Sequence, residues 1–336
     1  MSTAAFSPAL FPGVSNELLD ALGDELAAVE RELAARMGSA VATVEEIGRH
    51  TLEAGGKRLR PAFIALAARA CGGGDTARIA RLGACMEMIH MATLIHDDVV
   101  DHAATRRGRE TAGLLYGGTA SILSGDVLLA RAMAILADDG DLKIMRAVAD
   151  AVVEMAEGEV LEVETRGRFD LGEAEHLRVL RMKTAAFIEA CCLVGALAAG
   201  ATPSEQEALR QYGAAAGMAF QIVDDLLDYR GDFEQTGKPR ASDFREGCAT
   251  LPLIYLLEEL SDEEREVAGH KFGDGVADDE VLMICGWMAS RGAFERSEAT
   301  ARRCVDEARA ALDGLPSSPA RDLLGAVAGF VLEREA

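Results

Sequence analysis

The chain is poor in aromatic residues and in proline. Phenylalanine, tyrosine and tryptophan make up 5% of its 336 residues, and it has 8 prolines. Strands favour aromatic and β-branched side chains, whereas alanine, which is abundant here, is the strongest helix former. The composition therefore favours closely packed helices over a sheet protein, and a hydrophobic content of 49% is ample for a substantial core.

Positive charge is scarce. The chain has 34 lysines and arginines against 56 aspartates and glutamates, which gives a formal net charge of −22. A nucleic acid or an anionic membrane surface requires a broad basic face on the protein that binds it. The charge balance therefore argues against both kinds of partner.

Paired cysteines are absent as well. The seven cysteines form no CxxC motif, and most lie in apolar stretches, where free cysteine behaves as a small hydrophobe. We expect reduced core thiols and a cytoplasmic protein. The cysteines are Cys71, Cys85, Cys191, Cys192, Cys248, Cys285 and Cys304.

Long hydrophobic runs are missing. The longest, Ala190–Ala201, falls short of the roughly 20 residues that cross a bilayer, and Glu189 interrupts it upstream. The first 15 residues lack the charged start and apolar stretch of a signal peptide. We expect a soluble protein without a transmembrane segment, whose membrane encounters would be peripheral.

Helical periodicity runs through nearly the whole chain, and no stretch alternates as a strand would. No linker, low-complexity tract or repeat divides it, so we predict one all-α domain over residues 1–336, a helical bundle around a central cavity. Ser204 and Glu207 have the spacing of a capping box. The predicted helices span residues 16–37, 40–53, 58–71, 76–102, 112–137, 141–166, 173–199, 204–230, 249–259, 278–290, 292–313 and 317–333.

What the chain does have is two aspartate clusters of identical spacing. The first cluster is Asp97, Asp98 and Asp101, and the second cluster is Asp224, Asp225 and Asp228. On a helix, positions i and i+4 share a face, so like charges at this spacing repel one another. Two matched clusters in apolar surroundings indicate an external cation, and carboxylates with phosphate oxygens suit magnesium. The sequence predicts two helices that hold a magnesium-bound polyphosphate between them.

Basic residues are concentrated in two places. In Gly55–Pro61 (GGKRLRP) a glycine turn leads into a helix start, where backbone donors, Lys57 and Arg60 favour a diphosphate site over a merely solvated surface. Arg106 and Arg107 follow the first cluster, with a third arginine two residues later. These arginines could form a salt-bridge network with the aspartates or bind the anion that the metal shares.

Several single polar residues accompany these groups. His90 lies two helical turns before Asp97 on the same face, although a lone histidine on an apolar helix is more often a core residue; His96 is interpreted as structural. The remaining candidates are each compatible alone with a surface or capping role: Lys183, Thr184, Gln221 and Lys238. Together, two carboxylate clusters and two separate basic groups predict two phosphorylated substrates, one bridged by metal and one held by Lys57, Arg60 and a neighbour.

The motifs occur in a characteristic order: GGKRLRP (55–61), HMATLIHDDVVDHAATRRG (90–108), GD (125–126), KT (183–184), FQIVDDLLD (220–228) and GKPRASDFREG (237–247) before TLP (250–252). In them the chain resembles the trans-isoprenyl diphosphate synthases, the polyprenyl synthetase family, over about residues 40–260. The surrounding pattern most resembles the long-chain polyprenyl diphosphate synthases. The resemblance implies an all-α homodimer that adds isopentenyl diphosphate to an allylic diphosphate in the 1′-4 sense.

The resemblance also implies roles for the candidate residues. The six aspartates of the two clusters would hold three magnesium ions on the allylic diphosphate. Arg106, Lys183 and Lys238 would add positive charge to that group. Lys57, Arg60, His90 and Arg107 would bind isopentenyl diphosphate. Thr184 and Gln221 would line the reacting centre, so that the catalytic set is Lys183, Thr184, Gln221 and Arg106. No side chain is an obvious general base, in agreement with the family proposal that the leaving diphosphate takes the proton.

Two positions depart from the family pattern. Glu110 stands where many members have proline, and Cys248 stands where many have lysine, which removes one cation. Neither position is an expected metal ligand.

Product length is inferred from the residues before the first cluster. Short-chain members place bulky aromatics four or five residues before the first aspartate, where this chain has Thr93 and Ala92. The helical strip Cys85, Met88 and Ala92 also lacks aromatics, so we expect about six to ten isoprene units. Alternatively another helix forms the floor, which would make a farnesyl or geranylgeranyl diphosphate synthase; candidate floor residues are Met133, Phe169 and Phe187.

Two other readings have less support. A class I terpene cyclase normally mixes Asn/Asp, Ser/Thr and Glu in its second metal motif and needs no second diphosphate site. Non-catalytic partner subunits typically lose the aspartates or the basic motif, and both are intact here. Residues 262–336 carry no recognisable motif, and we expect them to be helices that close the bundle.

Overall fold

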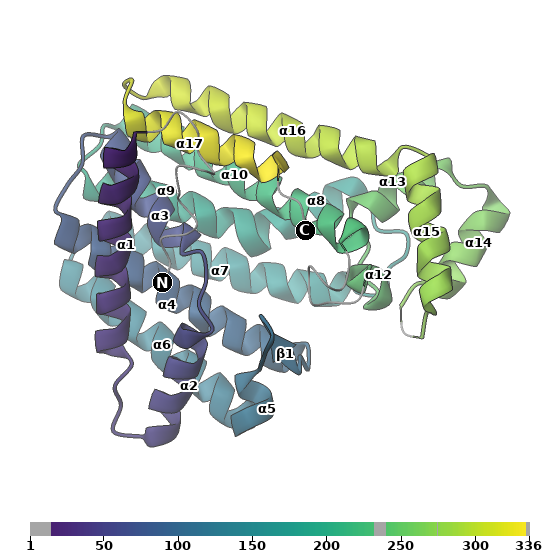
Figure 1. Cartoon of the computed structure of the whole chain (residues 1–336), viewed down its shortest axis with the longest axis horizontal. Coiled ribbons are helices and arrows are strands. Elements are labelled where there is room, and N and C mark those ends of the chain that lie inside the picture. Colours follow the sequence, from purple (N-terminus) through teal and green to yellow (C-terminus); the bar gives the residue numbers. More distant parts are fainter. Residues whose placement is uncertain (1–14, 232–239, 274, 334–336) are drawn as a thin grey trace. The chain divides into compact units, whose positions relative to one another are not determined.

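The computed structural model describes residues 15–231, 240–273 and 275–333, and most of them lie in helices (Figure 1). The all-α prediction is confirmed. The α-helices are α1 (Asn16–Arg36), α2 (Ala42–Glu53), α3 (Leu59–Ala70), α4 (Thr76–Val100), α5 (Ala112–Tyr116), α6 (Gly118–Asp139), α7 (Leu142–Thr165), α8 (Glu173–Leu180), α9 (Ala186–Ala198), α10 (Pro203–Arg230), α12 (Ser242–Arg245), α13 (Leu251–Glu259), α14 (Asp262–Lys271), α15 (Asp278–Ser290), α16 (Ala293–Ala311) and α17 (Pro319–Phe330). Shorter elements are β1 (Thr105–Arg106), β2 (Arg109–Glu110), η2 (Arg181–Ala185), η3 (Leu312–Gly314) and η4 (Val331–Glu333).

The described residues form two compact units. The first unit contains the chain up to Val148 together with Cys191–Leu209 and Gly314–Leu324. The second unit contains Ala149–Ala190, 210–313 and the chain from Gly325 onward. The first aspartate cluster belongs to the first unit and the second cluster to the second unit.

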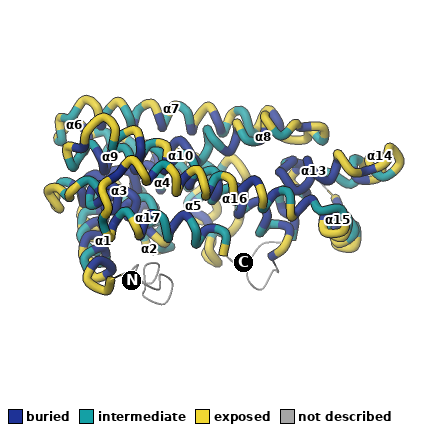
Figure 2. The backbone as a smooth tube through the Cα atoms, turned by 90° about the horizontal axis from the view of Figure 1, so that it is seen from above, coloured by how far each residue is buried: buried dark blue, intermediate teal, exposed yellow. Residues whose placement is uncertain are grey.

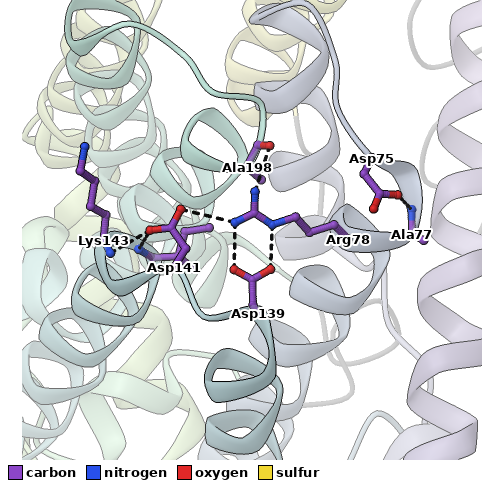
Figure 3. Close-up of polar contacts among 8 residues, drawn as sticks. Asp75, Ala77, Arg78, Asp139, Asp141, Lys143 and Ala198 are labelled. Atoms are coloured by element: carbon purple, nitrogen blue, oxygen red, sulfur yellow. Dashed lines mark hydrogen bonds and ion pairs between the residues drawn. The ribbon is translucent and has the colours of Figure 1, made fainter.

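In the first unit, α4 is the central helix. It packs against α6, α3 and α1, and its run from Leu82 to Ile89 is buried throughout (Figure 1). At the start of α4, Arg78 donates from Nε and Nη2 to the two carboxylate oxygens of Asp139, at 2.7 and 2.9 Å, and also to the carbonyl of Ala198 (Figure 3). The hydrogen bond from Arg78 lowers the pKa of Asp139. This pair ties the first turn of α4 to the ends of α6 and α9.

The second unit has its own buried layer. In it, α13 packs against α16, α15 and α8. The buried hydroxyls of Tyr255 and Thr300 lie 3.0 Å apart and connect α13 to α16. Ser261 and Glu264 form a full capping box at the start of α14, with the hydroxyl accepting from the Glu264 amide.

Several predicted boundaries are wrong for local reasons. The single helix predicted over 112–137 is two helices, because Gly117 adopts a positive φ of 83° between α5 and α6. The helix predicted over 173–199 contains the π-helical segment η2. The capping box of α10 uses Thr202 and Glu205 rather than Ser204 and Glu207, with Pro203 at the first helical position.

One described helix, α6, is long and apolar enough by length and composition to cross a membrane. It also packs against α4, α5 and α2, and Leu128, Ala132 and Leu136 on it are buried. Those contacts are typical of a core helix. All seven cysteines are free, as predicted.

Candidate functional site

The first aspartate cluster lies at the carboxyl end of α4. Asp97 and Asp98 occupy its last turn, and Asp101 is the C-cap residue, whose amide donates to the Asp97 carbonyl at 2.8 Å. The negative end of the helix dipole is unfavourable for carboxylates. Three aspartates here therefore destabilise the helix end unless a cation compensates, and hard oxygen donors fit a divalent metal such as magnesium.

Arg106 approaches this cluster from the β1–β2 hairpin. Its Nε donates to Oδ1 of the buried Asp98 at 2.6 Å. Both central residues of the hairpin turn, Arg107 and Gly108, have positive φ, 52° and 72°, as a type I′ turn requires. This hairpin was not predicted, because its strands are two residues long and leave no periodic signal. Arg106 thus forms an ion pair with the cluster. This is one of the two roles that the sequence predicted for these arginines.

Positive side chains gather around His90. The pKa of His90 lies well below its ordinary 6.5, first because of burial and then because of the positive charges of Arg60 and Arg107. Arg106 and Arg58 lower it further. Arg60, Arg106 and Arg107, all from the first unit, thus lie near enough to this ring for their charges to act on it.

The glycine turn before α3 meets the hairpin. Arg107 donates from Nη1 to the carbonyl of Gly55, which has a φ of 74°. A Cβ on Gly56 would lie 3.0 Å from Arg107 Nη1, so a larger residue here would require the guanidinium to shift by a few tenths of an ångström. Lys57 is exposed in the same turn. The two basic motifs, about 50 residues apart in the chain, therefore form one cationic region.

Arg58, within the same motif, has a different role that sequence reasoning missed. It is buried, donates from Nε to Glu30 at 2.7 Å and from Nη1 to the buried Glu87 at 2.9 Å. Glu87 lies on α4 one turn before His90, and it opposes the lowering of the pKa of Arg60 and of Arg107. The spacing Glu87–His90 on one helical face was the available signal.

The second aspartate cluster lies in the last turns of α10. Asp225 is buried and accepts at both oxygens, from Gln221 Nε2 at 3.3 Å and from His176 Nε2 at 2.9 Å. Asp228 accepts from the amides of Ser242 and Asp243, at 3.1 and 3.0 Å, and from the Ser242 hydroxyl. Asp228 thereby holds the start of α12, and Asp225 links α10 to α8.

Asp243 adds a carboxylate that sequence reasoning missed. Its pKa is raised well above the ordinary value, first by burial and then by the charges of Asp228 and Asp225. Cys248, where a lysine is usual, donates its amide to the Asp243 carbonyl. Burial raises the pKa of the Cys248 thiol to about 12, so it contributes no charge at neutral pH.

Lys183 and Thr184 lie in η2, and π-helical turns are frequent at functional sites. Burial alone would lower the pKa of Lys183, but the carboxylates of Glu162 and Glu159 outweigh it and raise the pKa. Lys183 Nζ lies 3.1 Å from Glu159 and also donates to Glu162. The Thr184 hydroxyl donates to Gln221 Oε1 at 3.1 Å, which connects η2 to the second cluster.

Two glycines make room for η2 in the second unit. A Cβ on Gly158 of α7 would lie 2.7 Å from the Lys183 amide nitrogen. A Cβ on Gly217 of α10 would lie 2.7 Å from Ala185 Cα. Both contacts are to backbone, which cannot swing aside as a side chain can.

Lys238 lies outside the described residues, so its predicted role stays a prediction. Within the described residues, no group of three or more metal-ligating side chains is already assembled. The roles of all six aspartates as metal ligands likewise stay predictions. His96, interpreted as structural, contacts the Ile122 carbonyl at 3.0 Å.

Comparisons with known proteins show which family the chain resembles. A family model described as polyprenyl synthetase matches residues 41–285. A heptaprenyl diphosphate synthase component 2 from Geobacillus stearothermophilus is 40% identical over 94% of this chain and 97% of its own. A short chain isoprenyl diphosphate synthase from Methanothermobacter thermautotrophicus is 38% identical over 87% of this chain and 91% of its own. A polyprenyl synthase from Caulobacter crescentus, crystallised with calcium and isoprenyl diphosphate, has a TM-score of 0.90 and 37% identity, covering 96% of this chain and 99% of its own.

Proposed function

Because the chain belongs to the polyprenyl synthetase family, we propose that it is a trans-prenyltransferase that joins isopentenyl diphosphate to an allylic diphosphate and releases a linear polyprenyl diphosphate. The observation that carries the proposal is the gathering of Arg60, Arg106 and Arg107 around His90, with Arg106 bonded to the first aspartate cluster. Cations beside carboxylates are what a metal-bridged diphosphate and a second, directly bound diphosphate require.

The two aspartate clusters bind the allylic diphosphate through magnesium, with three ions when the substrate is bound. The ligands are Asp97, Asp98, Asp101, Asp224, Asp225 and Asp228. Bound magnesium supplies positive charge to the leaving diphosphate. Support comes from the oxygen-only donor set and from the Caulobacter crescentus polyprenyl synthase, which was crystallised with calcium and isoprenyl diphosphate.

Charge placement explains the catalysis. Breaking the C1–O bond of the allylic substrate leaves its electron pair on the diphosphate, so cations stabilise the transition state more than the substrate. Lys183, with its raised pKa, stays charged for this role, and Arg106 and Lys238 add positive charge to the same diphosphate. Thr184 and Gln221 line the reacting centre. The isopentenyl double bond forms the new bond to C1, and the proton lost goes to the diphosphate.

Lys57, Arg60, His90 and Arg107 bind isopentenyl diphosphate. Because its pKa is lowered, His90 is neutral near pH 7. It therefore offers one N–H donor without adding charge, while the arginines supply the charge.

The first experiment supplies the purified chain alone with magnesium, radiolabelled isopentenyl diphosphate and either dimethylallyl, geranyl or farnesyl diphosphate. Products are dephosphorylated and sized by chromatography. Incorporation of label into linear prenols supports the proposal. Cyclic hydrocarbon would favour a class I terpene cyclase instead. Lack of incorporation would mean that the chain is a non-catalytic subunit or needs a partner, an outcome to consider because the Geobacillus stearothermophilus relative is named component 2.

The product has about six to ten isoprene units, supported by the heptaprenyl name of one relative and by the strip Cys85, Met88 and Ala92 without aromatics. All three residues are buried on α4. Ala92→Phe is expected to shorten the product by blocking the path of the tail. Product sizing checks it, with Ala92→Leu as the smaller matched change and thermal melting to confirm folding. An unchanged product distribution would contradict the path. Short products from the unaltered chain would favour the alternative named for the Methanothermobacter thermautotrophicus relative.

The functional form is a homodimer. In the first unit, α6 exposes apolar residues on one face, at Leu123, Ala130, Ala134 and Ala137, which recur at helical spacing. In the second unit, α7 exposes Val153, Val160 and Val163. Figure 2 shows exposed stretches along this helix. Faces of this kind are typical of interfaces. Sedimentation velocity should give twice the chain mass, and Leu123→Glu should shift it toward one chain; a single-chain mass for the unaltered protein would contradict the dimer.

The protein is assigned to the cytoplasm, without a transmembrane segment. Seven free cysteines support a reducing compartment, and the contacts of α6 support a core helix. Fractionation of cells with separate cytoplasmic and membrane markers tests this assignment.

A further inference from the structure

His176 has no role in the function described so far, although it is buried beside the second aspartate cluster. Its side chain is 6% exposed, as is that of Asp225, and its Nε2 lies 2.9 Å from Asp225 Oδ2. It comes from α8 and contacts the Asp225 oxygen that Gln221 does not contact. No sequence motif includes it.

The contacts form one continuous chain of four side chains. His176 contacts one oxygen of Asp225, Gln221 Nε2 contacts the other at 3.3 Å, and Gln221 Oε1 lies 3.1 Å from the Thr184 hydroxyl. Gln221 and Asp225 share a face of α10 at i and i+4 spacing. The chain therefore runs from α8 through α10 into η2, entirely within the second unit.

The direction of the hydrogen bonds in this chain follows from chemistry. An ionised carboxylate has no proton to donate, so both of its partners must be donors. Gln221 must then turn its amide N–H toward Asp225, which leaves its carbonyl oxygen toward Thr184. The Thr184 hydroxyl must donate to that carbonyl, and its lone pairs remain for another partner.

We propose that His176 is a positioning residue: its hydrogen bond to Asp225 fixes the Asp225–Gln221–Thr184 chain in the direction that leaves the Thr184 oxygen an acceptor at the reacting centre. An oxygen lone pair held there stabilises the positive charge that develops on the allylic carbon. The inference rests on the proposed prenyl transfer, because it assigns Thr184 to that centre.

Without His176, one oxygen of a buried carboxylate loses its donor. Asp225 and Gln221 are then free to take other orientations, and the Thr184 hydroxyl is no longer held as a donor to Gln221. Loss of a residue that orients a functional carboxylate typically costs 10- to 100-fold in activity. The loss falls on kcat, since the interaction with developing charge exists only in the transition state.

The test compares His176→Leu with His176→Gln, whose amide N–H reaches toward the position of Nε2. Under saturating magnesium, His176→Leu should lower kcat about 10- to 100-fold with little change in KM for either diphosphate, and His176→Gln should restore most of it. His270→Gln, at an exposed histidine of the second unit, is the matched control and should be unchanged. Equal losses in the Leu and Gln variants would overturn the positioning role.

A double-mutant cycle with Thr184→Val separates this role from a general loss of stability. If His176 acts through Thr184, the kcat of the double variant should match that of Thr184→Val alone, whereas independent effects would multiply. Multiplying effects would overturn the proposal. If His176→Leu does not fold, His176→Gln and His176→Asn, whose shorter side chain cannot reach Asp225, take its place in the cycle. Label incorporation by the unaltered chain in the same assay tests the proposed function separately.

Discussion

Two arginines of one short motif have opposite environments. Arg58 is 5% exposed and holds Glu30 and Glu87, whereas Arg60 lies among the cations around His90. Because Glu87 is also buried, removing Arg58 leaves a carboxylate without its partner in a medium that penalises charge. At the residue scale, two arginines of the same motif can therefore have different roles, one binding substrate and the other supporting the fold.

Arg58→Met should lower the free energy of unfolding by about 3 to 5 kcal/mol, as expected for one partner lost from a buried pair. Chemical denaturation measures this change. Arg49→Met removes a half-exposed arginine from an i, i+4 pair with Glu45 and should change stability far less. Similar losses of stability in the two variants would show that the buried pair of Arg58 and Glu87 contributes no more than the exposed pair.

His90 gives stability a pH dependence. In the unfolded chain it titrates near 6.5, and in the folded chain its pKa is well below that value because of burial and neighbouring cations. Between the two values the unfolded state binds a proton and the folded state does not, so stability falls as the pH is lowered through 6.5, by at most about 1.4 kcal/mol per pH unit from this group.

His90→Gln should remove this contribution. Unfolding free energies measured from pH 7.5 to pH 5 should decline less steeply in the variant than in the unaltered chain. His270→Gln, which changes an exposed histidine, should leave the slope as it was. The same slope in all three proteins would mean that His90 takes up its proton equally well in the folded state.

At the element scale, the sequence predicted helices well where apolar periodicity is long. The predicted ranges 16–37, 76–102 and 278–290 agree with α1, α4 and α15 to within two residues. It missed α14, because that helix is marked by its capping box rather than by an apolar face. It also missed η2, since a change from α to π hydrogen bonding depends on what packs against the helix, namely Gly158 and Gly217.

The packing around η2 makes a specific prediction. Gly217→Ala places a Cβ 2.7 Å from Ala185 Cα, so backbone must move. The shift displaces Lys183 and Thr184, and misplacement of about 1 Å at a reacting centre can cost 100-fold in rate. We expect kcat to fall at least tenfold while circular dichroism stays helical.

The control variant is Gly286→Ala, whose new Cβ has no atom within 4 Å. It should keep full activity and gain about 0.5 to 1 kcal/mol in stability. Full activity of Gly217→Ala would show that η2 tolerates movement.

At the site, contacts between residues that are far apart in the chain could not be predicted from the sequence. The aspartate clusters were recognisable because their residue types recur at fixed local spacing. Arg58 and Glu87 are 29 residues apart, and His176 and Asp225 are 49 apart, so no local pattern connects them. Asp243, close to the second cluster in space, lies within a recognised motif, but nothing in that motif marks it as buried among carboxylates.

At the scale of the whole molecule, composition correctly predicted the all-α class, since alanine-rich, aromatic-poor chains favour packed helices. One unit boundary, between Asp313 and Gly314, coincides with the glycine and proline of Gly314–Pro316. Four unit boundaries fall inside α7, α9, α10 and α17, where no glycine- or proline-rich linker marks them. That residues 1–336 act as a single polyprenyl synthase domain stays a prediction, and continuous helices across the boundaries support it.

A ligand that needs both aspartate clusters binds only when magnesium and diphosphate are present together and both clusters are intact. Magnesium and inorganic diphosphate together should therefore raise the melting temperature by more than the sum of their separate effects; ligand at 100 times its Kd contributes about 2.7 kcal/mol. Asp97→Asn, in the first unit, and Asp224→Asn, in the second, should each abolish this joint effect, because each removes a carboxylate from the proposed metal site. Asp138→Asn, which neutralises an exposed aspartate on α6, should retain it. A full joint effect in either cluster variant would mean that one cluster suffices to bind the metal diphosphate, and the other would then need a different role.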